Sequence, residues 1–374
     1  QPKELSFADE EIPICSSDIW ERIDQELLKN TYWQSNTMLY FKKANNTFIG
    51  FDAGLLNTGT QNVAVGNNAL FWNSTANYNT ALGNTALQAN TTADSNTAIG
   101  RSCMTENTTG ANNVAVGSTA LDANTTGGNN VAIGKDALGA NTTASSNVAV
   151  GAQAGLGNTT GDSNAALGFQ ALYTNTTGGA LTAMGRGALF ANTTASNNTA
   201  VGYLSLSSTT TGANNTAVGT FALDTNTTAS NNTAMGYAAM DANTTGSDNV
   251  AIGVQALDAN TTGAFNVSVG KGALTAQTTA NFNVAVGATA GSQVTTGTNN
   301  TLVGVNAGDT IQSGSNNVAI GFEAMCKNTT GTGTAVGAFA LDANTTGNNN
   351  TAVGRVALGV NTTGDYNVAM GQSA

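Results

Sequence analysis

The chain of 374 residues contains no histidine, which removes the commonest general base and metal ligand from consideration. Charged residues make up only 9% of it, against about 25% in ordinary proteins. Lysine and arginine number 11 against 22 acidic residues, so the formal net charge is −11. Without a basic stripe to neutralise phosphates, binding to nucleic acid is not expected.

Cysteine, proline and long apolar runs are also scarce. The three cysteines form an odd set that defines no disulfide framework. No apolar run approaches the roughly 20 residues of a membrane-spanning helix. The phosphate-binding Gly-x-x-x-x-Gly-Lys-Ser/Thr loop and the calcium-binding nonapeptide are missing as well. We therefore expect no enzyme, no catalytic residue, no cofactor and no metal.

Glycine, by contrast, recurs at a fixed interval. The motif "NNVAIG" ends at Gly134, and "SNVAVG" ends 17 residues later at Gly151. The same motif returns from Gly50 to Gly371, always in steps of 17 except for two steps of 16. A period below twenty residues is typical of a stacked-coil architecture, in which each coil contacts only its neighbours.

Positions in the repeat are numbered here from this marker glycine as zero. In most repeats, Asn occupies −4, Thr or Val −3, Ala −2, an apolar residue −1, Ala +3, Leu or Met +4, and Asn-Thr-Thr +7 to +9. The alternation predicts a short strand at −3 to −1, then a turn, a second extended segment and another turn. A helix is excluded because the repeat is rich in Gly, Asn and Thr, which are poor helix formers. The fold predicted is all-β, a parallel β-solenoid (β-roll) of about twenty 17-residue coils.

The repeat also suggests which side chains lie inside. We expect −3 and −1 to face inward with the +4 leucines, and the −4 asparagines to stack as a ladder of amides. Ala at −2 and Gly at zero would then face outward as a smooth strip. This strip either follows from the needs of the turn or packs laterally against identical chains. At a strand spacing of about 4.8 Å, the coils give a rod on the order of 90 Å long.

The motifs "NNVAVG", "NNTAVG" and "NVAIG" resemble the head repeats of trimeric autotransporter adhesins, and the resemblance covers residues 45 to 374. It implies a parallel β-roll that forms trimers. The sequence departs from that family in its longer period, where "ALxxNTTG" supplies an extra turn, and in showing neither a heptad stalk nor a membrane anchor. Similar Asn/Thr/Gly repeats also occur in fibre proteins of the phage-tail type.

The chain divides into three parts. Residues 1–15 read as an extended arm, residues 16–44 as a cap, and residues 45–374 as the repeat solenoid. Within the cap, "SSDIWERIDQELLKN" has the pattern of an amphipathic helix that begins at Asp18, with Glu21 three residues later. A solenoid needs its first open edge covered, and this segment suits that role.

At its other end the sequence reads "NVAMGQSA" and stops just after the marker Gly371, which offers an edge for pairing. We expect the arm of one subunit to cover the last coil of the next, which gives head-to-tail filaments. A disulfide between Cys15 and Cys326 of neighbouring subunits fits this arrangement, whereas Cys103 at +3 is expected to be a buried free thiol. The residues expected to take part in assembly are Leu5, Phe7, Ile12, Ile14, Cys15, Cys326, Val368 and Met370.

Two further features leave alternatives open. The Asn-Thr-Thr segments are glycosylation sequons, but the same residues are also what a tight turn requires. The candidate acceptors are Asn90, Asn107, Asn124, Asn141, Asn226, Asn243, Asn260 and Asn344. The threonine rows at +8 and +9 also suggest ice binding as a possible function, although only one of two adjacent threonines can face outward from a strand.

Together these patterns predict an exported structural or adhesive fibre subunit that polymerises head to tail. The alternative is the shaft or head of a laterally trimeric adhesin or tail fibre, and ice binding is a minor alternative. The first residue, Gln1, suggests a secreted chain without its signal peptide, at the cell surface or outside the cell. The partners expected are further copies of the chain and, for an adhesin, a surface or glycan receptor, but neither nucleic acid nor membrane.

Overall fold

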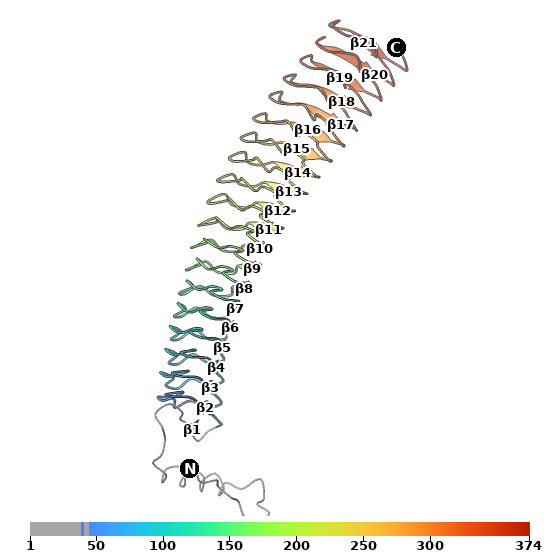
Figure 1. Cartoon of the computed structure of the whole chain (residues 1–374). Helices are drawn as coiled ribbons and strands as arrows, with labels where there is room; N and C mark the ends of the chain where they lie inside the picture. Colours follow the sequence, from blue (N-terminus) through green and yellow to red (C-terminus); the bar gives the residue numbers. More distant parts are fainter. Residues whose placement is uncertain (1–38, 41–44) are drawn as a thin grey trace, which may run out of the picture.

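The computed structural model of the protein describes residues 39–40 and 45–374. This part of the chain forms a gently curved rod in which successive coils stack from one end to the other (Figure 1). Within these residues, no helix is present that is both long and apolar enough to cross a bilayer. The arm predicted at residues 1–15 and almost all of the cap predicted at residues 16–44 lie outside the described residues.

Each coil contributes one short strand, and the marker glycine follows it directly. The strands are β1 (Leu39–Tyr40), β2 (Thr47–Ile49), β3 (Val63–Val65), β4 (Thr80–Leu82), β5 (Thr97–Ile99), β6 (Val114–Val116), β7 (Val131–Ile133), β8 (Val148–Val150), β9 (Ala165–Leu167), β10 (Thr182–Met184), β11 (Thr199–Val201), β12 (Thr216–Val218), β13 (Thr233–Met235), β14 (Val250–Ile252), β15 (Val267–Val269), β16 (Val284–Val286), β17 (Thr301–Val303), β18 (Val318–Ile320), β19 (Gly333–Val336), β20 (Asn350–Val353) and β21 (Val368–Met370).

The strands form one ladder in chain order. From β2 to β21 every pair is parallel, and each residue pairs with its equivalent in the next repeat, as Val131 in β7 does with Val148 in β8. Only β1 runs antiparallel to its neighbour β2. This register confirms the parallel β-solenoid, because identical repeat positions stack directly above one another along the rod.

The prediction of a second extended segment in each coil is wrong, because the residues after the glycine form turns instead. Three of them in each repeat adopt a left-handed backbone, as in Asp136 (φ 56°), Leu138 (φ 50°) and Ser146 (φ 61°). This conformation lets the amide groups bond along the rod axis: the Asp136 N–H donates to the Ser118 carbonyl at 3.1 Å, and that of Leu138 to Ala154 at 3.0 Å. These bonds between coils offset the cost of a positive φ at residues other than glycine.

The marker glycine is required by a close approach between coils. Gly134 has φ +133°, and a Cβ atom built on it would lie 2.5 Å from the carbonyl oxygen of Gly151 in the next coil. Any side chain here would force the stacked coils apart, which explains why glycine recurs at this position.

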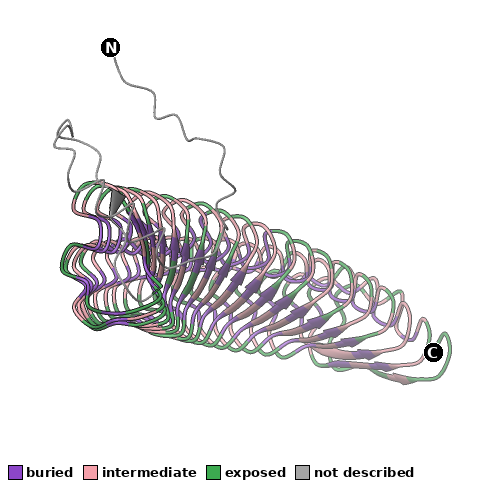
Figure 2. Ribbon diagram, turned by 90° about the horizontal axis from the view of Figure 1, so that it is seen from below, coloured by how far each residue is buried: buried purple, intermediate pink, exposed green. Residues whose placement is uncertain are grey.

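The predicted orientation of the strand is also wrong, because the −2 alanines face the core and the −1 and −3 residues face solvent. In β7 Ala132 is fully buried, whereas Ile133 is 39% exposed. The core consists of Ala132 and its equivalents against Ala137 at +3 and Leu138 at +4. In Figure 2 the buried backbone accordingly follows the inner side of each coil. The coil is too thin to hold both the +4 leucine and a second large residue from the strand, so the small residue turns inward.

Exceptions in the core compensate one another in volume. Where Gly308 replaces the +4 leucine, Leu302 replaces the −2 alanine, and a Cβ on Gly308 would lie 2.7 Å from a methyl group of Leu302. In the first coil Gly54 takes the +4 position beside Phe48, whose ring would lie 2.7 Å from such a Cβ. The interior therefore keeps a nearly constant volume by exchanging large and small residues across the coil.

The −4 asparagines form the predicted ladder. The Asn130 backbone N–H donates to the Asn113 side-chain oxygen one coil earlier at 2.9 Å. The Asn130 side-chain amide donates to the carbonyl of Ala144 at 2.9 Å. Each side chain thus satisfies backbone groups that the turn leaves without partners, which accounts for the burial of an amide in so narrow a core.

Candidate assembly surface

The outward face of the ladder, called the sheet face below, consists of the −3 and −1 side chains of β2 to β21. Its −1 residues are all Val, Ile, Leu or Met, and its −3 residues are Thr or Val except for Ala165. Large side chains remain open along the rod: Leu82 is 45% exposed, Met184 41% and Ile320 39%. The sheet face is therefore a continuous, regular and mostly apolar surface running the length of the rod.

Sequence reasoning expected the −2 alanines and marker glycines to form an outward strip, but the structure places the alanines in the core. A period of two says that −3 and −1 share one side and −2 and zero the other, but not which side is buried. The smooth Ala/Gly strip expected outside is the inner surface, where Ala132 and its equivalents pack. What faces outward is a row of Val, Ile, Leu and Met at −1 beside mostly Thr and Val at −3. Large exposed apolar patches are typical of interaction surfaces.

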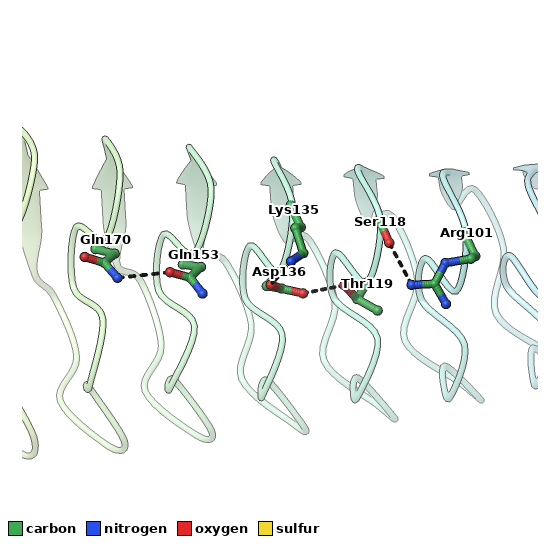
Figure 3. A network of polar contacts seen from close by, with 7 residues as sticks. All are labelled: Arg101, Ser118, Thr119, Lys135, Asp136, Gln153 and Gln170. Atoms are coloured by element: carbon green, nitrogen blue, oxygen red, sulfur yellow. Dashed lines mark hydrogen bonds and ion pairs between the residues drawn. The ribbon is translucent and has the colours of Figure 1, made fainter.

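One edge of the sheet face is formed by the +1 residues, called the +1 rim. Several polar contacts run along it and along the neighbouring +2 positions, either between coils or within one coil (Figure 3). Arg101 donates to the Ser118 hydroxyl at 3.4 Å, and Lys135 forms an ion pair with Asp136 at 3.6 Å. Gln170 continues the row by donating to Gln153 of the preceding coil at 3.0 Å.

Aromatic side chains continue the same rim near the middle of the rod. The Arg186 guanidinium lies over the rings of Phe169 and Tyr203, with centroids 6.0 and 5.6 Å away. The ring of Phe221 at +2 contacts Tyr203 edge-on at 5.5 Å and Tyr237 at 6.2 Å. These contacts stiffen exposed side chains beside the sheet face, which lowers the entropy lost if a partner covers them.

The residues predicted for head-to-tail assembly fall into two groups. Leu5, Phe7, Ile12, Ile14 and Cys15 lie outside the described residues. In the last described coil, Val368 is 72% exposed and Met370 74%. Cys326, three coils earlier, is a half-buried free thiol. Because the first group lies outside the described residues, this contact stays a prediction.

The thiol predictions concern two different environments. Cys103 is fully buried, as predicted, and donates to the Ala115 carbonyl at 3.2 Å. Burial raises the pKa of this thiol to about 12. Burial, and then the nearby carboxylates, raise the pKa of Cys326 to about 11. Neither thiol is activated as a nucleophile.

Cys326 also lies in a small cluster that sequence reasoning missed. Its sulfur and the carboxylates of Glu323 and Asp342 lie within 4.8 Å of one another. The signal was the +5 alignment of Asp309, Cys326 and Asp342 in successive coils, which the sparse count of aspartates obscured. Lys327 forms an ion pair with Asp342 at 3.5 Å, so part of the negative charge is already neutralised.

The sequon asparagines at +7 lie inside the rod. Seven of the eight candidates are completely buried, and Asn344 is 1% exposed. The Asn107 amide donates to the Asn90 side-chain oxygen at 3.0 Å and to the Gly110 carbonyl at 2.9 Å. They thus form a second amide ladder, whereas sequence reasoning considered them only as turn residues or glycosylation acceptors. A glycan on these nitrogens would require modification before the coil folds.

The +8 threonines use their hydroxyl groups within the rod. Thr108 donates to the carbonyl of Thr125, and Thr125 to that of Thr142, both at 3.0 Å. Hydroxyls engaged in this way are not free to order water, which weakens the argument for ice binding from the threonine rows.

No protein-family model matches the chain, and a search of curated proteins gives no match.

Proposed function

We propose that the chain is a structural fibre subunit whose rod associates side by side with identical copies through the sheet face. The observation that carries this proposal is the unbroken row of exposed or half-buried apolar side chains at −1 from β2 to β21, beside the Thr and Val residues at −3. Each coil lacks the room to bury these side chains in its own core. A second copy of the same flat surface offers a complementary partner without any additional chain.

The size of the sheet face suits a stable interface. Twenty strands at about 4.8 Å give a length of roughly 95 Å, and three residues give a width of about 10 Å. The resulting area of about 950 Å² per copy exceeds the roughly 800 Å² that each partner buries in an interface of standard size. Two faces packed together, or three around a common axis, both bury the apolar rows.

The rod's mechanics support a structural role. The strands from β2 to β20 each pair with two neighbours, and two buried amide ladders bond most coils to the next. A body built this way resists bending and extension because deforming it breaks many bonds at once. We also propose that the protein acts outside the cell, as expected from the sequence. Cell fractionation tests this location.

The proposal is tested by measuring the mass of the full chain in solution by light scattering and sedimentation. We expect a defined multiple of the 37.4 kDa chain. Placing three charges on the sheet face should yield monomers with an unchanged circular dichroism spectrum. The face variant carries Ile133→Glu, Val150→Glu and Ile252→Glu, and the matched control carries Thr126→Glu, Thr143→Glu and Thr245→Glu at exposed +9 positions.

The control should remain oligomeric. A wild-type chain that stays monomeric at tens of micromolar would refute side-by-side association. If such a monomer also shaped or slowed growing ice crystals, the outward threonines of the sheet face would carry the minor alternative instead.

Head-to-tail polymerisation through the arm is compatible with lateral packing and is proposed as a separate contact. Electron microscopy of the full chain beside a version without residues 1–15 distinguishes the two. Filaments that shorten to single rods on truncation support the arm's role, whereas bundles of equal length from both chains leave only the lateral contact.

A further inference from the structure

The two edges of the sheet face carry opposite charges. On the +1 rim, five of the twenty residues are cations and none is acidic: Arg101, Lys135, Arg186, Lys271 and Arg355. The opposite edge, formed by positions −6 and −5 and called the −5 rim, contains four acids and no cation: Asp94, Asp162, Asp248 and Asp365. All nine side chains are exposed. The separation is notable in a chain where only 9% of residues are charged.

The charges on the two rims also lie at matching heights along the rod. Asp94 and Arg101 belong to the same coil, the one with marker Gly100. Each of the other three acids is one coil away from a cation. These pairs are Asp162 with Arg186, Asp248 with Lys271, and Asp365 with Arg355. One coil is about 4.8 Å, which a lysine or arginine side chain spans easily.

The remaining cation is accounted for within the chain. Lys135 forms its ion pair with Asp136 of its own coil, and no acid of the −5 rim lies within one coil of it. Every acid of the −5 rim therefore has one matching cation on the +1 rim, and the unmatched cation has a partner nearby.

From this pattern we infer that the copies pack parallel and in register to within one coil, with the +1 rim of one against the −5 rim of the next. The inference rests on the proposed side-by-side association. Turning one sheet face onto another with the rods parallel brings opposite rims together, in a pair or around a threefold axis. An antiparallel arrangement instead places the +1 rim against the +1 rim of the partner, so that each cation lies within about two coils of a cation of the partner and no acid lies on the facing rim. The repulsion between like charges opposes this arrangement.

Axial stagger is the other arrangement to exclude. Four of the cations recur at every fifth coil, so a shift of five coils in either direction, or of six coils in one direction, still forms three of the four pairs. Such a shift leaves a quarter or more of each sheet face uncovered. The arrangement in register forms all four pairs and covers the whole face.

Orientation is measured with spin labels on full-length chains in which Cys15 and Cys326 are serine. Single cysteines replace Thr109 near one end or Thr211 near the centre, both exposed at +9 and away from the sheet face. Parallel copies give the same distance between labels at both sites. Fully overlapped antiparallel copies add about 60 Å of axial separation at Thr109 but little at Thr211. When chains labelled at different coils are mixed, the pair of coils with the shortest distance between labels gives the register.

The charge pairing is tested at Asp248 and Lys271, whose side chains lie on opposite rims of one chain. Lys271→Asp should weaken association by about threefold to tenfold, because it places two acids together at each contact. Adding Asp248→Lys should restore it. If Lys271→Asp only impaired folding, adding Asp248→Lys would not be expected to restore association. The control is thermal unfolding of the monomer, which shows whether Lys271→Asp affects folding.

Equal distances with rescue support the inference. Unequal distances in an intact oligomer, a shortest distance five or six coils away, or failure of the double variant to recover would each overturn it while leaving side-by-side association standing. Absence of any coupling between labels, with a monomeric mass, would overturn the proposed function itself.

Discussion

Substitution of Asn124 by alanine tests whether the buried +7 ladder holds the coils together. The Asn124 amide donates to the Asn107 side-chain oxygen at 2.7 Å and to the Gly127 carbonyl at 2.9 Å. Its own oxygen accepts from Asn141 at 2.8 Å. Alanine removes all three bonds. The Gly127 carbonyl keeps a donor in Asn113, and Asn141 keeps its bond to Ala144, but no other bond reaches the Asn107 oxygen.

The expected loss of local stability is about 2–4 kcal/mol. An orphaned buried acceptor costs about 1–3 kcal/mol, and the small cavity left by the side chain adds about 1 kcal/mol. In a repeat array the effect stays local, because each coil contacts only its neighbours. Coils flanking Asn124 should open more readily while distant coils are unchanged.

Native-state hydrogen exchange resolves this effect coil by coil. At about 1.4 kcal/mol per tenfold change, amide protection between residues 107 and 147 should fall by roughly 30-fold or more. Thr126→Ala, an exposed position two residues away, serves as the control and should change stability by less than about 0.5 kcal/mol. Equal protection in the two variants would refute the ladder's energetic role, and a uniform loss along the rod would refute its local character.

Three further outcomes follow from particular residues. Thr209 interrupts the +7 ladder and leaves the Asn192 side-chain oxygen without a partner, so Thr209→Asn should raise the local unfolding free energy by about 1–2 kcal/mol, measured by the same exchange experiment. With a pKa of about 11, Cys326 should react with iodoacetamide at pH 8 roughly 100-fold more slowly than a free thiol of pKa 9.0. Cys103, whose pKa is about 12, should react only after the protein unfolds. Fast labelling of either thiol would contradict the structure. Burial raises the pKa of Asp241, so the folded state binds its proton more tightly than the unfolded chain does. Its stabilising contribution is present below the ordinary carboxyl pKa near 3.8 and is lost as pH rises through the folded value, so the melting temperature should increase from pH 7 toward pH 4, and less so in Asp241→Asn.

The repeat's period predicted a great deal of the fold. A step of 17 residues places identical positions above one another in any stacked arrangement, so parallel pairing and the register of Val131 with Val148 followed from the sequence. The need for glycine at Gly134 and the −4 amide ladder followed from the same periodicity. Cys103 could be placed inside because it occupies a small-residue position of the repeat.

The assembly surface depended on a choice that the sequence left open. Alternation between Ala132 and Ile133 fits either orientation of the strand, and the larger apolar residue was the natural candidate for the core. The three-dimensional coil reverses this, because left-handed turns at Asp136 and Leu138 fold the chain back so closely that leucine fills the space opposite the strand. Alanine must therefore face inward and isoleucine outward.

The sequence by itself determined the period, the parallel stacking and the recurrence of small, amide and apolar residues, because these depend only on equal spacing along the chain. Only the tertiary structure decided which rows became core, ladder or surface. That decision rests on the cross-section of a single coil, where the turns' backbone conformations set the thickness available to side chains. It placed the sequon asparagines, expected in a turn, in the interior, and the branched residues of the strand, expected in the interior, on the outward face.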